Sequence, residues 1–301
     1  MTWTPPDDGR DFLGYGEQPP VVAWPGAARV AVSIVLNIEE GAELAVSSGD
    51  ERNEAVHELV DPPIEDRALG MESHFEYGSR AGYWRIMRVL DGFHVPVTLN
   101  VCARALVRTP WVGTRAMARG DEIMCHGWRW ETHLGMGPDD ERAVIARSVA
   151  AIRDVTGERP VGWHVKSNPS ANTRRLLLEE GGFLYDSNLY NDDLPVTLHT
   201  GPRPYVLLPY AFDTNDMNFH VGNRFVHADD FARYCCDAYD WLFEEGAAVP
   251  RMMTIGLHTR IIGRPGRIAG LERFLAHVTR KGGAWFARRD AIARAWLDAG
   301  L

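Results

Sequence analysis

Residues 29–37 read RVAVSIVLN, and the chain continues with IEEG at residues 38–41. The first segment is a short, β-branched apolar run, which predicts a buried β-strand. It ends abruptly at Glu39, Glu40 and Gly41. A pair of carboxylates directly after a buried strand is either a solvated turn or a place where one side chain points into a site. There it would serve as a general base or a metal ligand.

Outside this stretch, short apolar runs alternate with segments of helical periodicity. We expect further strands at 95–101, 122–126, 161–165, 183–186, 206–209 and 252–258. We expect helices from Ser79, at 111–119, from 139, and at 172–180, 229–245, 268–278 and 289–297. This alternation predicts an α/β protein whose mainly parallel sheet has helices outside, either open or closed into a barrel.

The domain organisation follows from the same pattern. Residues 1–28 are rich in Pro and Gly and predict an arm over the surface, while residues 29–301 predict one domain. Residues 41–78 lack clear periodicity and predict a long loop, and a loop of this length is more often functional than idle.

Composition limits the partners. The chain has 301 residues, 45% hydrophobic and 24% charged, with a formal net charge of −9, so an acidic body would repel nucleic acid and anionic membranes. The sequence contains no apolar run of about 18 residues, and its first residues do not resemble a signal peptide. We therefore expect a cytoplasmic protein whose partner is a small molecule.

The segment HGWRWETH, residues 126–133, concentrates two histidines, two tryptophans, an arginine and a glutamate. A metal site would use His126 and His133 with a carboxylate. The alternative is a substrate pocket walled by Trp128 and Trp130. The spacing of the two histidines fits neither His-x-x-x-His nor a close pair, so both interpretations stay open.

A second histidine stands at a strand end, because the apolar run 252–258 finishes at His258. A single histidine is more often structural, but strand ends carry the chemistry in barrels. Polar loops containing Asp192 and Asn215 are candidates for holding a substrate, with Asx-turns as the alternative. The sequence has no Gly-rich phosphate motif and no Gly-x-Ser-x-Gly, which disfavours nucleotide-binding and serine-hydrolase functions.

Several strings follow one another in a specific order. They are WPGAARVAVSIVLNIEEG (24–41), MESHFEYGSRAGYWR (71–85), HGWRW (126–130), LPYAFDTNDM (208–217) and MMTIGLHTRIIGRPGR (252–267). With them the chain resembles the polysaccharide deacetylase (NodB-homology) superfamily, and most closely its branch of deacetylase-like allantoinases and cyclic imide hydrolases. The resemblance covers nearly the whole chain. It implies a deformed, incomplete TIM-like barrel of the (β/α)7 type, in agreement with the alternation of strands and helices.

The resemblance also bears on a metal. Metal-dependent members hold the ion with an Asp after the first strand and a His-x-x-x-His pair, and a late histidine transfers protons. By the resemblance, Glu39 stands at the Asp position, His126 at the first His and His258 at the late one. Trp130 replaces the second metal ligand, so we expect no required cofactor. A divalent metal such as zinc, held by Glu39, His126 and His133, is the open alternative.

The function implied by the resemblance is hydrolysis of a non-peptide carbon–nitrogen bond, most directly the ring opening of a cyclic ureide or imide. We expect Glu39 to be the base that deprotonates water, His126 to orient the water or the carbonyl, and His258 to protonate the leaving nitrogen. The side chains expected to bind the substrate are Trp128, Trp130, Lys166, Asp192 and Asn215. Lys166 lies in HVKSNPS (164–170), where relatives commonly carry an Arg-containing Gly-rich loop, so the substrate can differ from allantoin.

Two other functions stay open. One is metal-dependent N-deacetylation of a peptidoglycan-like or chitin-like sugar, which the replaced metal ligand disfavours. The other is a catalytically degenerate module that only binds a small molecule, which the carboxylate and imidazoles at three strand ends disfavour. The resemblance further implies a homo-oligomer, either a dimer or a tetramer.

Overall fold

The computed structural model describes residues 10–56, 66–199, 203–220, 222 and 225–301. The first nine residues of the predicted arm and part of the predicted loop 41–78 therefore lie outside the described residues. Among the described residues, nine strands form one sheet: β1 (Val30–Ile38), β2 (Thr98–Val101), β3 (Glu122–Cys125), β4 (Gly162–Trp163), β5 (Tyr185–Asp186), β6 (Val196–Leu198), β7 (Tyr205–Leu207), β8 (Arg251–His258) and β9 (Ala284–Phe286).

The strand order is β6-β7-β5-β4-β3-β2-β1-β8, and β9 pairs with β1 outside this path. The pairings are parallel except that of β6 with β7. The chain after β7 returns to β8, where Asn215 forms a single bridge with Gly256 and the Thr214 hydroxyl donates to the Thr254 carbonyl at 2.6 Å. The sheet is thus curled into a deformed, incomplete barrel, which confirms the predicted fold class.

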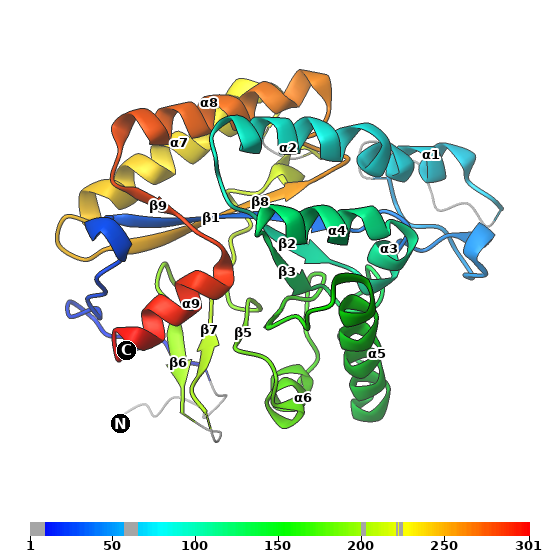
Figure 1. The fold of residues 1–301 in the computed structure, drawn as a ribbon, viewed down its shortest axis with the longest axis horizontal. Helices are drawn as coiled ribbons and strands as arrows, with labels where there is room; N and C mark the ends of the chain where they lie inside the picture. The colour runs from blue at the N-terminus through cyan, green and yellow to red at the C-terminus, as the bar shows by residue number, and fades with distance from the viewer. Residues whose placement is uncertain (1–9, 57–65, 200–202, 221, 223–224) are drawn as a thin grey trace, which may run out of the picture.

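Helices cover the outside of this sheet (Figure 1). In the described part of the chain they are α1 (Leu69–Tyr77), α2 (Tyr83–Gly92), α3 (Ala103–Arg108), α4 (Pro110–Arg119), α5 (Pro138–Thr156), α6 (Thr173–Glu180), α7 (Ala228–Glu245), α8 (Pro265–Lys281) and α9 (Arg289–Asp298). In Figure 1, α7 and α8 run side by side above β1, while α5 and α6 lie below it.

The strand predicted at residues 29–37 is the centre of the core. All nine residues of β1 are buried, and the strand pairs with β2, β8 and β9. A parallel strand with neighbours on both edges and helices over it needs apolar side chains on both faces, which explains its continuous Val, Ile and Leu content.

The helix predicted to start at Ser79 is an error. Helix already begins at Leu69, and α1, a π-helical turn (Gly78–Gly82) and α2 follow one another without a break. A Cβ on Gly82 would collide with the carbonyl oxygen of Thr259, just after β8. Glycine at position 82 therefore lets the helix approach the strand ends closely. Because this need for glycine comes from a tertiary contact, no periodic pattern in the local sequence indicates the helix start.

The predicted arm has two parts in the described residues. Residues 10–18 are exposed, whereas Val22 and Trp24 are buried. The indole of Trp24 donates to the Arg251 carbonyl at 2.9 Å and packs 5.9 Å from the ring of Trp285. The second part of the arm is thus anchored in the body.

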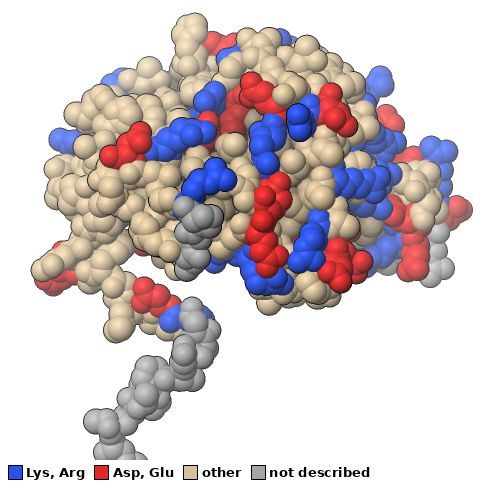
Figure 2. All heavy atoms as spheres, turned by 60° about the horizontal axis from the view of Figure 1, so that its bottom comes forward, with Lys and Arg blue, Asp and Glu red and all other residues tan. Residues whose placement is uncertain are grey.

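The surface carries charges of both signs. On the face shown in Figure 2, Lys and Arg side chains are interspersed with Asp and Glu, so opposite charges lie close together there. None of the helices in the described residues is long and apolar enough to span a membrane.

Candidate active site

A cavity of about 450 Å³ opens where β1, β3 and β8 end. Its lining includes side chains from these strand ends and from the loops that follow β4 and β7: Asn37, Glu39, Glu54, His126, Trp130, His164, Lys166, Tyr190, Tyr210, Phe212, Asn215, His258 and Arg260. Parallel strands bring their carboxyl ends to one edge of a barrel, so residues far apart in the sequence meet here.

Glu39 is the carboxylate at the centre of this cavity and is 1% exposed. Its Oε1 lies 3.5 Å from His126 Nε2 and 3.4 Å from His258 Nε2. Arg260 Nη1 donates to its Oε2 at 2.7 Å. Burial alone would raise the pKa of Glu39, but Arg260 and His258 outweigh it and hold the pKa well below the ordinary value. Glu39 is therefore ionised at neutral pH.

His258 is fixed by a second carboxylate, that of Asp216. The Nδ1 of His258 lies 2.6 Å from Asp216 Oδ1, and the backbone N–H groups of His258 and Ile262 donate to Asp216 Oδ2 at 2.7 and 3.0 Å. Burial alone would lower the pKa of His258, but Glu39 and Asp216 raise it to about 10. His258 is thus an imidazolium at neutral pH, with Nε2–H facing Glu39.

His126 is oriented by the backbone. Its Nδ1 lies 2.5 Å from the carbonyl oxygen of His164, and a carbonyl only accepts, so Nδ1 carries a hydrogen. Its ring stacks on that of His164 with 5.3 Å between centroids and 1° between planes. The other ring nitrogen, Nε2, is therefore the atom that faces Glu39.

Trp130 and Lys166 also lie in the cavity wall. The Lys166 ammonium is 3.5 Å from the centroid of the Trp130 ring and 3.1 Å from Glu54 Oε2. The Arg260 guanidinium lies over the same indole at 4.8 Å. Trp130 is thus packed against two cations, which is a favourable place for the face of an indole.

Asn215 lies in the cavity wall too. Its Oδ1 accepts from the Met217 N–H at 2.9 Å, and its Nδ2 donates to the Tyr210 hydroxyl at 3.4 Å. Six predicted residues therefore line one cavity, namely Glu39, His126, His258, Trp130, Lys166 and Asn215. His164, from the loop that contains Lys166, lines it too and was not predicted.

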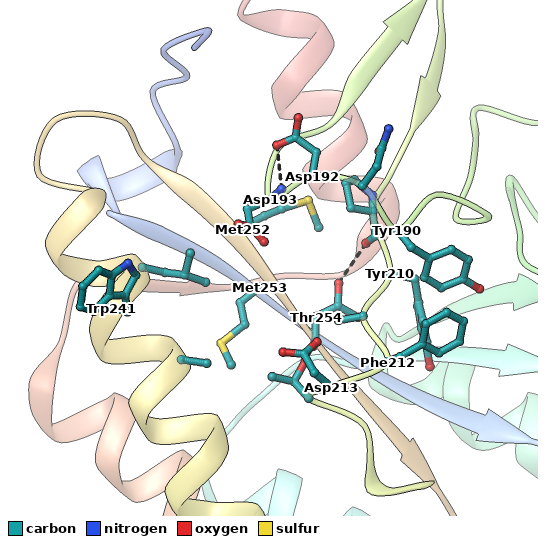
Figure 3. Close-up of a pocket in the computed structure, with 16 residues that line it drawn as sticks. Tyr190, Asp192, Asp193, Tyr210, Phe212, Asp213, Trp241, Met252, Met253 and Thr254 are labelled. Carbon is teal, nitrogen blue, oxygen red and sulfur yellow. Dashed lines mark hydrogen bonds between the residues drawn. The ribbon is translucent and has the colours of Figure 1, made fainter. Parts of the chain in front are cut away.

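Two residues predicted to bind the substrate, Trp128 and Asp192, do not line this cavity. Trp128 is not among the residues that line the cavity, and the Arg147 guanidinium covers its ring at 3.5 Å. Asp192 accepts from the Tyr15 hydroxyl at 2.7 Å and lines a separate pocket of about 620 Å³ (Figure 3). Both residues sit in loops, whose paths the sequence does not determine.

The alternative metal set of Glu39, His126 and His133 is not brought together. His133 is fully buried in a separate cluster, where its Nδ1 lies 2.8 Å from Glu141 Oε1. Glu141 in turn accepts from the hydroxyl of Ser170 at 2.5 Å. In the part of the chain that the structure describes, no three His, Cys, Asp or Glu side chains are grouped so that they could hold a metal ion.

Two charged residues of the site were not predicted: Arg260, which lines the cavity, and the buried Asp216, which binds His258. Both lie beside residues that were predicted, Arg260 two positions after His258 and Asp216 directly after Asn215. A buried carboxylate and a buried histidine each need a partner of opposite charge, so a charged residue close to each was the available signal.

Comparison with known proteins decides the family. A family model described as polysaccharide deacetylase matches residues 71–178. A protein of Schizosaccharomyces pombe named "Putative polysaccharide deacetylase" is 36% identical, covering 95% of this chain and 96% of the relative. The chain belongs to the polysaccharide deacetylase family. This confirms the resemblance.

Two solved structures are similar to this chain over nearly its full length. One, the crystal structure of Puue allantoinase, is 44% identical with a TM-score of 0.92, covering 97% of this chain and 98% of that one. The other, a "probable Polysaccharide deacetylase" from Pseudomonas aeruginosa PAO1, is also 44% identical, with a TM-score of 0.91 and coverage of 96% and 98%. The family and these likenesses identify the chain as a hydrolase of carbon–nitrogen bonds.

Proposed function

We propose that this polysaccharide deacetylase family member opens the ring of a cyclic ureide or imide by hydrolysis. The observation that carries the proposal is the approach of an ionised Glu39 to a protonated His258, at 3.4 Å, on the floor of a cavity with aromatic walls. Such a pair offers both an acceptor and a donor of protons to one reacting amide. The likeness to Puue allantoinase supports a ring as the substrate.

In the proposed reaction, water attacks a ring carbonyl carbon and the bond between that carbon and the ring nitrogen breaks. Glu39 accepts a proton from the water, and His258 Nε2–H donates a proton to the leaving nitrogen. His126 Nε2, which is 3.5 Å from Glu39 Oε1, orients the water between them. The product is one opened chain that carries a carboxylic acid at one end and, at the other, an amide or urea nitrogen that has gained a hydrogen and stays bonded to the second carbonyl.

The two proton transfers assist each other. A carboxylate whose pKa is low is a weak base, and the imidazolium of His258 is one cause of the low pKa of Glu39. When His258 gives up its proton, that positive charge disappears and the affinity of Glu39 for a proton rises. The pair is therefore suited to transferring protons in one connected event.

We propose that no metal takes part. The residues fit an ion poorly, because the Arg260 guanidinium already binds Oε2 of Glu39 and the Lys166 ammonium lies over Trp130 in the same wall. The Arg260 guanidinium and the His258 imidazolium are both beside the Glu39 carboxylate, and they raise the electrostatic cost of a further cation there. The fully buried His133 faces Glu141 instead of the cavity.

Trp130, Lys166 and Asn215 are proposed as the residues that hold the substrate. The indole of Trp130 forms part of the cavity wall and holds the cations of Lys166 and Arg260 against its ring. Lys166 and Asn215 offer hydrogen-bond donors to carbonyl oxygens, which a ureide or an imide carries on both sides of a nitrogen.

The test is a panel of purified-protein assays with allantoin, hydantoin, succinimide and N-acetylglucosamine oligomers, run with and without a chelator. We expect turnover of at least one cyclic compound that survives chelation and is lost in Glu39→Gln. Deacetylation of the sugar alone would replace the proposal with N-deacetylation. Activity that the chelator removes and zinc restores would overturn the metal-free mechanism.

A further inference from the structure

A chain of polar side chains behind the cavity has fixed hydrogen positions, because it starts at a backbone group. Asn37 Nδ2 lies 3.0 Å from the carbonyl oxygen of Leu257 in β8, which only accepts. The amide nitrogen of Asn37 is therefore on that side, and its Oδ1 faces Asn100. Asn100 Nδ2 donates to this oxygen at 2.8 Å.

The next link sets the tautomer of His164. The same Asn100 Nδ2 lies 3.2 Å from His164 Nδ1. An amide nitrogen carries two hydrogens and no free acceptor site, so Nδ1 must accept. Burial, and then the nearby His126, hold the pKa of His164 well below the ordinary value, so the ring is neutral. Its one hydrogen is then on Nε2.

The last link is Tyr190. His164 Nε2 lies 3.0 Å from the Tyr190 hydroxyl, so the histidine donates and the phenol oxygen accepts. The phenol keeps its own hydrogen, because burial raises the pKa of Tyr190. Among the described residues, the structure gives this hydrogen no acceptor, and Tyr190 lines the catalytic cavity.

The ring of Tyr190 is also held in place. It stacks on Phe212 with centroids 4.2 Å apart and planes 10° apart. Tyr190, Tyr210 and Phe212 line both the catalytic cavity and the separate pocket of about 620 Å³ that contains Asp192, here called the second pocket, and so form a wall between the two. In Figure 3 these three rings stand together at one side of the second pocket, opposite Trp241. The hydroxyl of Tyr190 therefore has little freedom to turn elsewhere.

We propose that Tyr190 is a substrate-binding residue whose hydroxyl donates a hydrogen bond to a carbonyl oxygen of the substrate. Asn37, Asn100 and His164 are positioning residues that force this hydroxyl to be a donor. The inference rests on the proposed function for the identity of the substrate. It sharpens that function, because the group beside Tyr190 must be an acceptor such as a ring carbonyl, and not a ring N–H.

The tautomer can be measured without any substrate. In protein labelled with ¹⁵N at histidine, we expect the His164 resonances of a neutral ring with hydrogen on Nε2 and not on Nδ1. The assignment comes from comparison with His164→Gln. A hydrogen on Nδ1 would overturn the inference, because Tyr190 would then donate to His164 and present only lone pairs to the cavity.

The binding role is tested with Tyr190→Phe, which removes the hydroxyl and keeps the ring on Phe212. We expect kcat/KM for the cyclic probes hydantoin and succinimide to fall about tenfold, as loss of one hydrogen bond predicts. Tyr239→Phe is the matched control, since that hydroxyl donates to the Gly282 carbonyl far from the cavity. Equal kcat/KM in wild type and Tyr190→Phe would overturn the inference.

Asn100→Asp tests the positioning chain. A carboxylate there accepts a hydrogen from His164 Nδ1, which reverses the tautomer. We expect Asn100→Asp to lose as much kcat/KM as Tyr190→Phe, and the double variant to lose no more than either. Additive losses would overturn the positioning role. If the wild type acts on the N-acetylglucosamine probe instead, the proposed function fails, while the same variants compared on that probe still decide the inference.

Discussion

Glu39 and Glu40 are neighbours at the end of β1, yet they face two different regions of the molecule. Glu39 lines the cavity and lies close to His126, His258 and Arg260. Glu40 is absent from the lining of that cavity, and its Oε1 accepts from the Thr259 hydroxyl beneath the glycine-containing helix turn at Gly78.

The two carboxyls differ in pKa although both are buried and both lie near Arg260. Burial raises the pKa of Glu40, and Arg260, 3.5 Å away, does not compensate for it. For Glu39, the guanidinium at 2.7 Å and the imidazolium of His258 overcome the same penalty. Both carboxyls are buried, and the number and closeness of the cations beside each one decide whether its pKa is raised or lowered.

The largest expected effect separates these two carboxyls directly. Glu39→Gln should lower kcat/KM by about 10²–10⁴, since it removes the proton acceptor. Glu40→Gln should keep most of the rate, because Glu40 does not line the cavity, and should change stability by about 1 kcal/mol or less. Steady-state kinetics and urea unfolding measure both. If Glu40→Gln were as inactive as Glu39→Gln, the conclusion that only Glu39 takes part in the reaction would be wrong.

The next effect concerns the pH dependence on the cavity side. His258 acts as an acid only when protonated, and its pKa is raised to about 10, so kcat/KM should hold up to that pH and fall above it. Asp216→Asn removes one cause of the high pKa, so the alkaline fall should move to lower pH. A pH–rate profile shows this. An unchanged alkaline limb in Asp216→Asn would remove His258 from the role of acid.

A smaller effect tests the helix-facing side. A Cβ at position 82 would collide with the Thr259 carbonyl, so Gly82→Ala should destabilise the protein by about 1–3 kcal/mol. Gly70→Ala is the matched control, because position 70 is also helical and has nothing within 4 Å. It should stabilise by about 1 kcal/mol or less. Equal stability of both variants in urea would show that the close approach is unimportant.

The smallest effect concerns residues placed outside the cavity. Asp192→Asn and Trp128→Phe should leave kcat and KM nearly unchanged, because Asp192 pairs with Tyr15 and Trp128 packs under Arg147. The same assays with Lys166→Met, which changes a residue of the cavity wall, provide the contrast. A large rise in KM for Asp192→Asn would return that residue to the substrate site.

Much of the fold followed from local patterns. The apolar run at residues 29–37 predicted the central strand, and the alternation of strands and helices predicted a parallel sheet. The histidines at strand ends predicted polar groups at one edge of that sheet. The glycines at 78 and 82 gave no such signal, because their role depends on contact with Thr259, far away in sequence. The helix start was therefore misplaced.

The sequence by itself determined that Glu39, His126 and His258 stand at the ends of strands, and parallel strands in a barrel place such ends together. Only the tertiary structure decided the rest. Trp128, Asp192 and His133 lie in loops and do not line the cavity, because the spacing of residues along a loop does not determine the direction in which their side chains point. The tertiary structure also places Arg260 beside Glu39 and Asp216 beside His258. The charge of a buried group depends on the neighbours that pack against it, and these neighbours come from distant parts of the chain.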